Sequence, residues 1–142
     1  MSVQLDHSIA SHEPGARSWW RAVSILLVAA IFLQAVFAGA MLSGFEWARA
    51  AHMANAVFVV AATFAASLVS FLTLRRISGG MKLGLSLLVL ASVVFVQFAL
   101  GRMAAKGANL MWLHIPLGVV AVGLAGQVVA AARALGLAKG AA

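Results

Sequence analysis

The sequence predicts an all-α integral membrane protein in which four helices form one bundle. Of its 142 residues, 64% are hydrophobic and 9% are charged, whereas soluble domains have roughly 45–50% apolar and about 25% charged residues. The apolar residues form four runs, each long enough to cross a hydrocarbon core of about 30 Å as a helix. The second half of the chain also repeats a pattern of the first. The repeat predicts that two similar helical hairpins make up the bundle.

The boundaries of the elements follow from the polar breaks between the runs. The polar residues 1–18 are expected to form a flexible cytoplasmic tail; it contains His7 and His12, but we expect no site there. The bundle is expected over residues 19–135, with helices at about 22–44, 49–74, 83–103 and 110–135, followed by a C-terminal tail at 136–142. Gly79 and Gly80 are a turn signal and mark the joint between the two hairpins. One domain is therefore expected.

The basic residues predict the orientation in the membrane. Cytoplasmic loops carry an excess of Lys and Arg, and most of the basic residues fall at the termini and in the middle break. The proposed inner side holds Arg17, Arg21, Arg75, Arg76, Lys82, Arg133 and Lys139, and the outer side holds Arg49, Arg102 and Lys106. Both termini are thus expected in the cytoplasm, in a multi-pass protein of the bacterial inner membrane. The net charge of +7 serves orientation, so nucleic acid is not an expected partner.

Each predicted hairpin carries a glutamine in its first helix and a histidine just inside its second. Gln34 precedes His52 by 18 residues, and Gln97 precedes His114 by 17 residues. The second and fourth helices run in the same direction across the membrane. The two histidines are therefore expected at nearly the same depth, about one turn inside the outer interface.

A histidine inside a membrane span is costly and normally has a partner or a function. Glu46 is the only acid in the predicted helical region, so carboxylates cannot pair with both histidines. One hypothesis is a haem b whose iron is bound by His52 and His114, a kind of site that helix bundles host. Its pocket would include Arg49, Arg102 and Lys106 on the propionate side, together with Gln34, Gln97, Gly39, Gly101 and Gly118.

Two further roles for the histidines remain open. In the first, each histidine only packs helices together and bonds a backbone carbonyl, the glutamine of the preceding helix, or water. In the second, His52 and His114 bind copper or zinc, with Met53 or Met111 as a further ligand, although two histidines alone are an incomplete set. Asn55 is expected to bond a neighbouring helix. Pro116 is expected either to delay the start of the fourth helix or to kink it.

The sequence resembles a family of small four-helix bacterial membrane proteins of unknown function over nearly its whole length. The residues that carry this resemblance are the Gln and Gly of each hairpin, His52, and the stretch from Trp112 to Gly118. More distantly it resembles one four-helix half of haem A synthase, in which histidines at the outer ends of the second and fourth helices bind haem. By position these are His52 and His114. The acidic residue that the synthase family carries three residues before its first helical histidine is Arg49 here, so the resemblance supports haem binding more than catalysis.

These observations predict a b-type cytochrome-like membrane protein that transfers electrons or handles haem. The alternative is a non-redox accessory subunit of a larger membrane complex. A small transporter ranks third, because proton-coupled transporters usually place a carboxylate in the membrane. An electron carrier or accessory protein is favoured over an enzyme. The expected partners are the lipid bilayer, a redox or membrane-complex partner, and a second copy of the chain.

Overall fold

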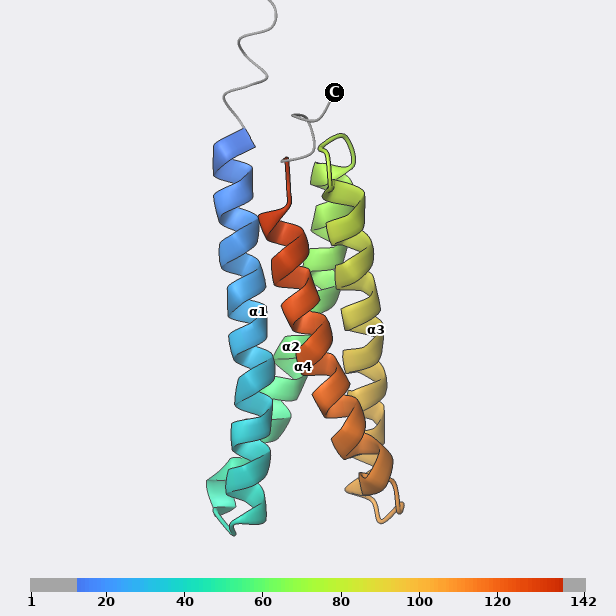
Figure 1. The fold of residues 1–142 in the computed structure, drawn as a ribbon. Helices are drawn as coiled ribbons and strands as arrows, with labels where there is room; N and C mark the ends of the chain where they lie inside the picture. The colour runs from blue at the N-terminus through green and yellow to red at the C-terminus, as the bar shows by residue number, and fades with distance from the viewer. Residues whose placement is uncertain (1–12, 137–142) are drawn as a thin grey trace, which may run out of the picture.

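The computed structural model describes residues 13–136, which form four α-helices (Figure 1). The helices are α1 (Glu13–Leu42), α2 (Glu46–Leu74), α3 (Gly80–Ala104) and α4 (Met111–Arg133). No strand occurs within this range, so the predicted all-α class is confirmed. All four helices are long and apolar enough to cross a membrane, as expected for a multi-pass membrane protein.

The first helix differs most from its prediction. It begins at Glu13, nine residues before the predicted start at 22, within the stretch that was expected to be a tail. The extension follows from tertiary packing: Trp20 is only 3% exposed, and Arg17 lies against Gly136 beyond the end of α4. The other helix ends differ from their predictions by three residues or fewer. The rest of the predicted tails, residues 1–12 with His7 and His12 and residues 137–142, lie outside the described residues.

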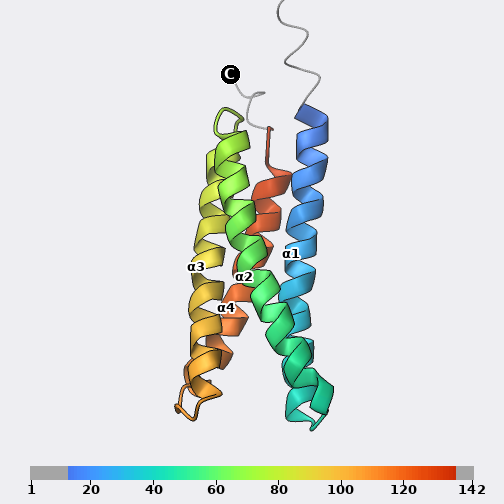
Figure 2. The ribbon, with the colours of Figure 1, turned by 180° about the vertical axis from the view of Figure 1, so that it is seen from behind.

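The helices form a ring in which each packs against its neighbours in the chain and α1 also packs against α4. Within the described residues the diagonal pairs, α1 with α3 and α2 with α4, do not pack together. Residues 13 and 136 and the α2–α3 connection lie at one end, here called the terminal end (Figures 1 and 2). The α1–α2 and α3–α4 connections lie at the other, here called the loop end. In both views the two hairpins diverge toward the loop end.

The hydrophobic core occupies mainly the terminal half of the bundle. Its largest fully buried side chains include Leu74, Leu83, Leu87 and Leu90. Near the loop end, Ala48 is the buried hydrophobic residue among those described. Burial of apolar surface and close packing therefore hold the hairpins together in one half, and the divergence occurs where this core ends.

The terminal end is closed by contacts between the connections and the last turn of α4. Arg21 Nη2 donates a hydrogen bond to the Arg133 carbonyl at 3.4 Å, and a cation near the last carbonyls of a helix complements the helix dipole. The Gly136 N–H donates to the Ser78 carbonyl at 2.9 Å. Gly79 adopts a φ of 80°, which a glycine reaches without strain, so the predicted turn at this joint is confirmed.

Pro116 lies inside α4, five residues after its first residue, Met111. Of the two alternatives, a late start of the helix is therefore wrong, because α4 begins before the proline. This placement brings His114 into the first turn of α4.

Candidate functional site

His52 of α2 is held against α1. Its Nδ1 lies 3.2 Å from the Gln34 carbonyl oxygen, and its Nε2 lies 3.4 Å from the Gln34 side-chain Nε2. The imidazole is half-buried. The sequence produces this contact because the α1–α2 connection is short, so that residues near the end of α1 lie beside residues near the start of α2.

His114 of α4 is held in the same way against α3. Its Nδ1 lies 3.1 Å from the Gln97 carbonyl oxygen, and the Gln97 side-chain Nε2 donates a 2.7 Å hydrogen bond to the His114 carbonyl. This ring is also half-buried. The same backbone contact thus occurs in both hairpins, between the glutamine and the histidine that the sequence singled out.

The carbonyl contacts define which ring nitrogen carries the proton in the neutral form. A carbonyl oxygen can only accept, so Nδ1 donates in both His52 and His114. The lone pair of a neutral ring is then on Nε2. A histidine that binds a metal commonly donates its other ring N–H to a carbonyl in this manner, which fixes the tautomer and the ring orientation.

The two hairpins differ at the side chains of their glutamines. Asn55 Nδ2 donates to Gln34 Oε1 at 2.6 Å and to the Ala30 carbonyl at 2.8 Å, as expected for a residue that bonds a neighbouring helix. The Gln34 amide is thereby directed at His52. In the second hairpin Gln97 Oε1 is buried and has no hydrogen-bond partner among residues 13–136.

A sequence difference accounts for this asymmetry. Asn55 follows His52 by three residues, whereas Leu117 holds the corresponding position after His114. Leucine cannot donate a hydrogen bond, so the amide of Gln97 turns to the backbone. His52 Nε2 therefore accepts a long contact from Gln34, whereas the side chain of Gln97 bonds the His114 carbonyl and not its ring.

The three predicted glycines are placed differently. A Cβ at Gly101 would lie 2.9 Å from His114 Cε1, and a Cβ at Gly118 would lie 3.0 Å from Gln97 Nε2. Glycine at position 101 thus allows the close approach of the His114 ring, whereas at position 118 the nearest atom is the end of the flexible Gln97 side chain. A Cβ at Gly39 would meet nothing within 4 Å, so the structure does not place Gly39 against His52.

The three basic residues predicted on the propionate side all lie toward the loop end and are exposed. Arg49 is in the first turn of α2, Arg102 is in the last turn of α3, and Lys106 is in the α3–α4 connection. They are on the same end of the bundle as the two histidines. Each could meet a negatively charged group at the membrane surface.

The histidines are on the diagonal helices α2 and α4. Within the described residues these two helices do not pack against each other. Each ring contacts the helix that precedes it in the chain: His52 contacts α1 and His114 contacts α3. No group of three or more His, Cys, Asp or Glu side chains that could hold a metal ion occurs among residues 13–136.

Comparison with known proteins gives no relative: no family model, curated protein or solved structure matches the chain. The functional argument therefore depends on the geometry of the chain itself.

Proposed function

We propose that this protein is a membrane-bound, b-type cytochrome-like haem protein with His52 and His114 as the axial ligands. One observation carries the proposal. In each hairpin the histidine Nδ1 is bonded to the carbonyl of a glutamine, at 3.2 and 3.1 Å, so that Nε2 carries the lone pair that would bind iron. This is the ligand form of an imidazole, and it occurs on the two helices that do not pack against each other. In His52, iron would replace the 3.4 Å contact of Nε2 with the Gln34 amide.

The donor set favours haem over an isolated metal ion. Copper or zinc sites in proteins usually take three or four protein ligands, and no such group occurs in the described residues. A haem brings four nitrogen ligands of its own and needs only two axial ligands from the protein. Two neutral histidines satisfy that requirement. A bound haem would supply the ability to take up and release one electron.

The surrounding residues would orient the ligands and the edge of the macrocycle. Gly101 gives the His114 ring room, and Gln97 fixes the backbone of the same residue. Arg49, Arg102 and Lys106 are placed at the loop end, where they could pair with propionates. A cation beside a carboxylate forms a strong, charge-assisted hydrogen bond.

The same proposal includes the finer points of topology. The two hairpins would be repeats of one unit, since each contains the same histidine-to-glutamine backbone contact. The terminal end would face the cytoplasm, because most of the basic residues lie there. The haem would then lie in the outer half of a bacterial inner membrane. There the protein would transfer electrons or handle haem.

A second candidate function, a non-redox accessory subunit, is supported by the Gln34 amide. Its contact with His52 Nε2 at 3.4 Å, together with the 2.6 Å bond from Asn55 to Gln34, satisfies the polar groups of this hairpin without a ligand. In that case both histidines would serve only to fasten one helix to another.

Absorption spectroscopy distinguishes the two functions. The protein is expressed with added haem, purified in detergent, and compared with the variants His52→Ala and His114→Ala. We expect a Soret band in the wild type that is lost or strongly reduced in both variants. His12→Ala, which removes a histidine outside the described residues, should keep the band. A helical, monodisperse wild type that stays colourless would refute haem binding and leave the accessory role.

A further inference from the structure

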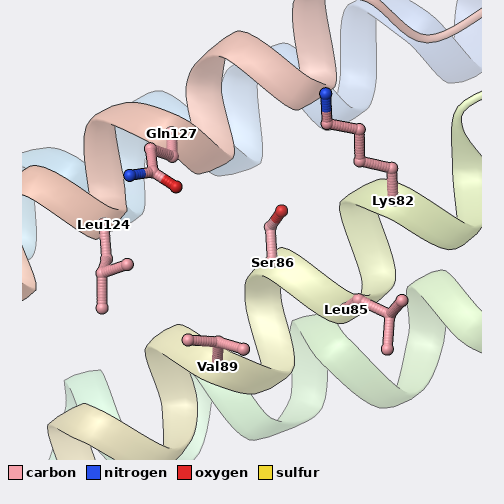
Figure 3. A pocket seen from close by; sticks show the side chains of 6 residues that line it. All are labelled: Lys82, Leu85, Ser86, Val89, Leu124 and Gln127. Atoms are coloured by element: carbon pink, nitrogen blue, oxygen red, sulfur yellow. The ribbon is translucent and has the colours of Figure 1, made fainter.

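A groove between α3 and α4 lies toward the terminal end, away from the two histidines. It has a volume of about 400 Å³ and is lined by Lys82, Leu85, Ser86 and Val89 of α3 and by Leu124 and Gln127 of α4. Figure 3 shows that the Ser86 hydroxyl points across the groove toward α4 and that the Gln127 amide turns toward α3. Polar groups from two helices thus converge on one open space.

The residues that line the groove change from mainly polar near the membrane surface to apolar nearer the middle of the membrane. Lys82 lies in the first turn of α3, close to the membrane surface. Ser86 is six residues after the start of α3 and Gln127 is six residues before the end of α4, which puts both roughly 9 Å from the helix ends. Val89 and Leu124 lie one turn deeper. A ligand that fits this order has a charged end, a polar middle and an apolar remainder.

The side chains of Ser86 and Gln127 offer hydrogen-bonding groups to a ligand in the groove. Gln127 is exposed on the outside of a membrane-spanning helix. An amide that faces hydrocarbon without a hydrogen bond is costly. The Ser70 and Ser92 hydroxyls each donate to a carbonyl of their own helix, whereas the Ser86 hydroxyl is directed into the groove.

We propose that this groove binds one anionic phospholipid from the leaflet at the terminal end. Lys82 would pair with the phosphate, Ser86 and Gln127 would bond the oxygens of the ester region, and Val89 and Leu124 would contact the start of an acyl chain. A phospholipid has this sequence of charged, polar and apolar parts along its length. This proposal does not depend on whether the protein binds haem.

A second copy of the chain fits the groove less well. A two-fold symmetric contact places the same surface on both subunits, so a dimer through this groove would bring two Lys82 side chains together. Like charges repel, and the phosphate of a lipid has the opposite charge to lysine. Charge complementarity therefore favours the lipid.

Native mass spectrometry of protein released from nanodiscs tests the site. The nanodiscs contain equal amounts of phosphatidylglycerol and phosphatidylcholine, and the lipid retained by the protein is identified. We expect the wild type to retain phosphatidylglycerol preferentially. Lys82→Gln should lower that retention about tenfold, the effect of losing one charge-assisted hydrogen bond. Arg76→Gln, which removes a cation from the same end but outside the groove, should change it little.

Gln127→Leu provides a second test that keeps every charge. It should also reduce retention of phosphatidylglycerol, with the helical circular dichroism unchanged. Equal retention by the wild type, Lys82→Gln and Gln127→Leu would overturn the proposal. Efficient disulfide cross-linking of Gln127→Cys in membranes would also overturn it, by identifying a second copy as the occupant. So would displacement of the lipid by excess inorganic phosphate, since a site for free phosphate does not need the apolar wall.

Discussion

Gly101 and Gly39 provide a matched test of how the second histidine is positioned. Each glycine closely follows the glutamine of its hairpin, and each lies in the loop-end half of a helix. A methyl group at Gly101 would lie 2.9 Å from His114 Cε1, whereas one at Gly39 would meet nothing within 4 Å. The change Gly101→Ala should therefore displace the His114 ring, and Gly39→Ala should leave His52 where it is.

The size of the effect follows from the difference between the two variants. Both exchanges gain helix propensity, about 0.8–1.0 kcal/mol in a helix interior, so this gain cancels in the comparison. Gly101→Ala alone adds a steric clash, and overpacking costs typically about 1–3 kcal/mol. We expect Gly101→Ala to be less stable than Gly39→Ala by about 1–3 kcal/mol. Moving a ligand out of position also typically costs about 10–100-fold in affinity, so haem binding should weaken in Gly101→Ala alone.

Two measurements check this prediction. Unfolding by SDS in mixed micelles, followed by circular dichroism, gives the stability of each variant. Haem titration followed at the Soret band gives the affinity. Equal stability of Gly101→Ala and Gly39→Ala would refute the steric reasoning. A clear loss of stability in Gly101→Ala with unchanged haem affinity would retain the packing contact but remove His114 from the ligand set.

Two further predictions concern stability alone. Gln34→Leu should lower the free energy of unfolding more than Gln97→Leu, by about 1 kcal/mol, because Gln97→Leu also removes a buried oxygen that has no partner in the described part of the chain. Equal losses in the SDS assay would contradict this. Gly80→Ala should lower the stability of the protein strongly, by about 3 kcal/mol or more, because its methyl group would overlap the Leu74 carbonyl. Gly123→Ala has open space and should be tolerated. A Gly80→Ala protein with wild-type thermal stability would show that the α2–α3 turn can shift.

Most of the fold could be predicted from the sequence because a membrane span has few solutions. Backbone groups in hydrocarbon must be satisfied within the helix, so a long apolar run predicts a spanning helix and a polar break predicts its end. The start of α1 could not be predicted in this way. Residues 13–21 are not an apolar run, and they are helical through contacts such as that of Arg17 with Gly136. Tertiary packing determines this boundary, and hydropathy does not report it.

The pairing of each histidine with a glutamine could be anticipated from their spacing across a short connection. The role of Gly39 was harder to judge. Gly101 follows Gln97 by four residues, but Gly39 follows Gln34 by five, and one residue turns a helix position by about 100°. The difference between Asn55 and Leu117 is also visible in the sequence, yet its meaning depends on where Gln34 and Gln97 point. Side-chain direction is a property of the packed structure.

The unequal distribution of the core would let the two hairpins move relative to each other at the loop end while they stay packed at the terminal end. The fully buried leucines join the hairpins near the terminal end, and the hairpins diverge beyond them (Figure 2). Each histidine is hydrogen-bonded within its own hairpin, His52 to the Gln34 carbonyl and His114 to the Gln97 carbonyl. A change in the angle between the two hairpins would thus alter the distance between the His52 and His114 rings, while both histidine-to-glutamine contacts and the core at the terminal end stay intact. Paired spin labels on the α1–α2 and α3–α4 connections would measure that angle directly.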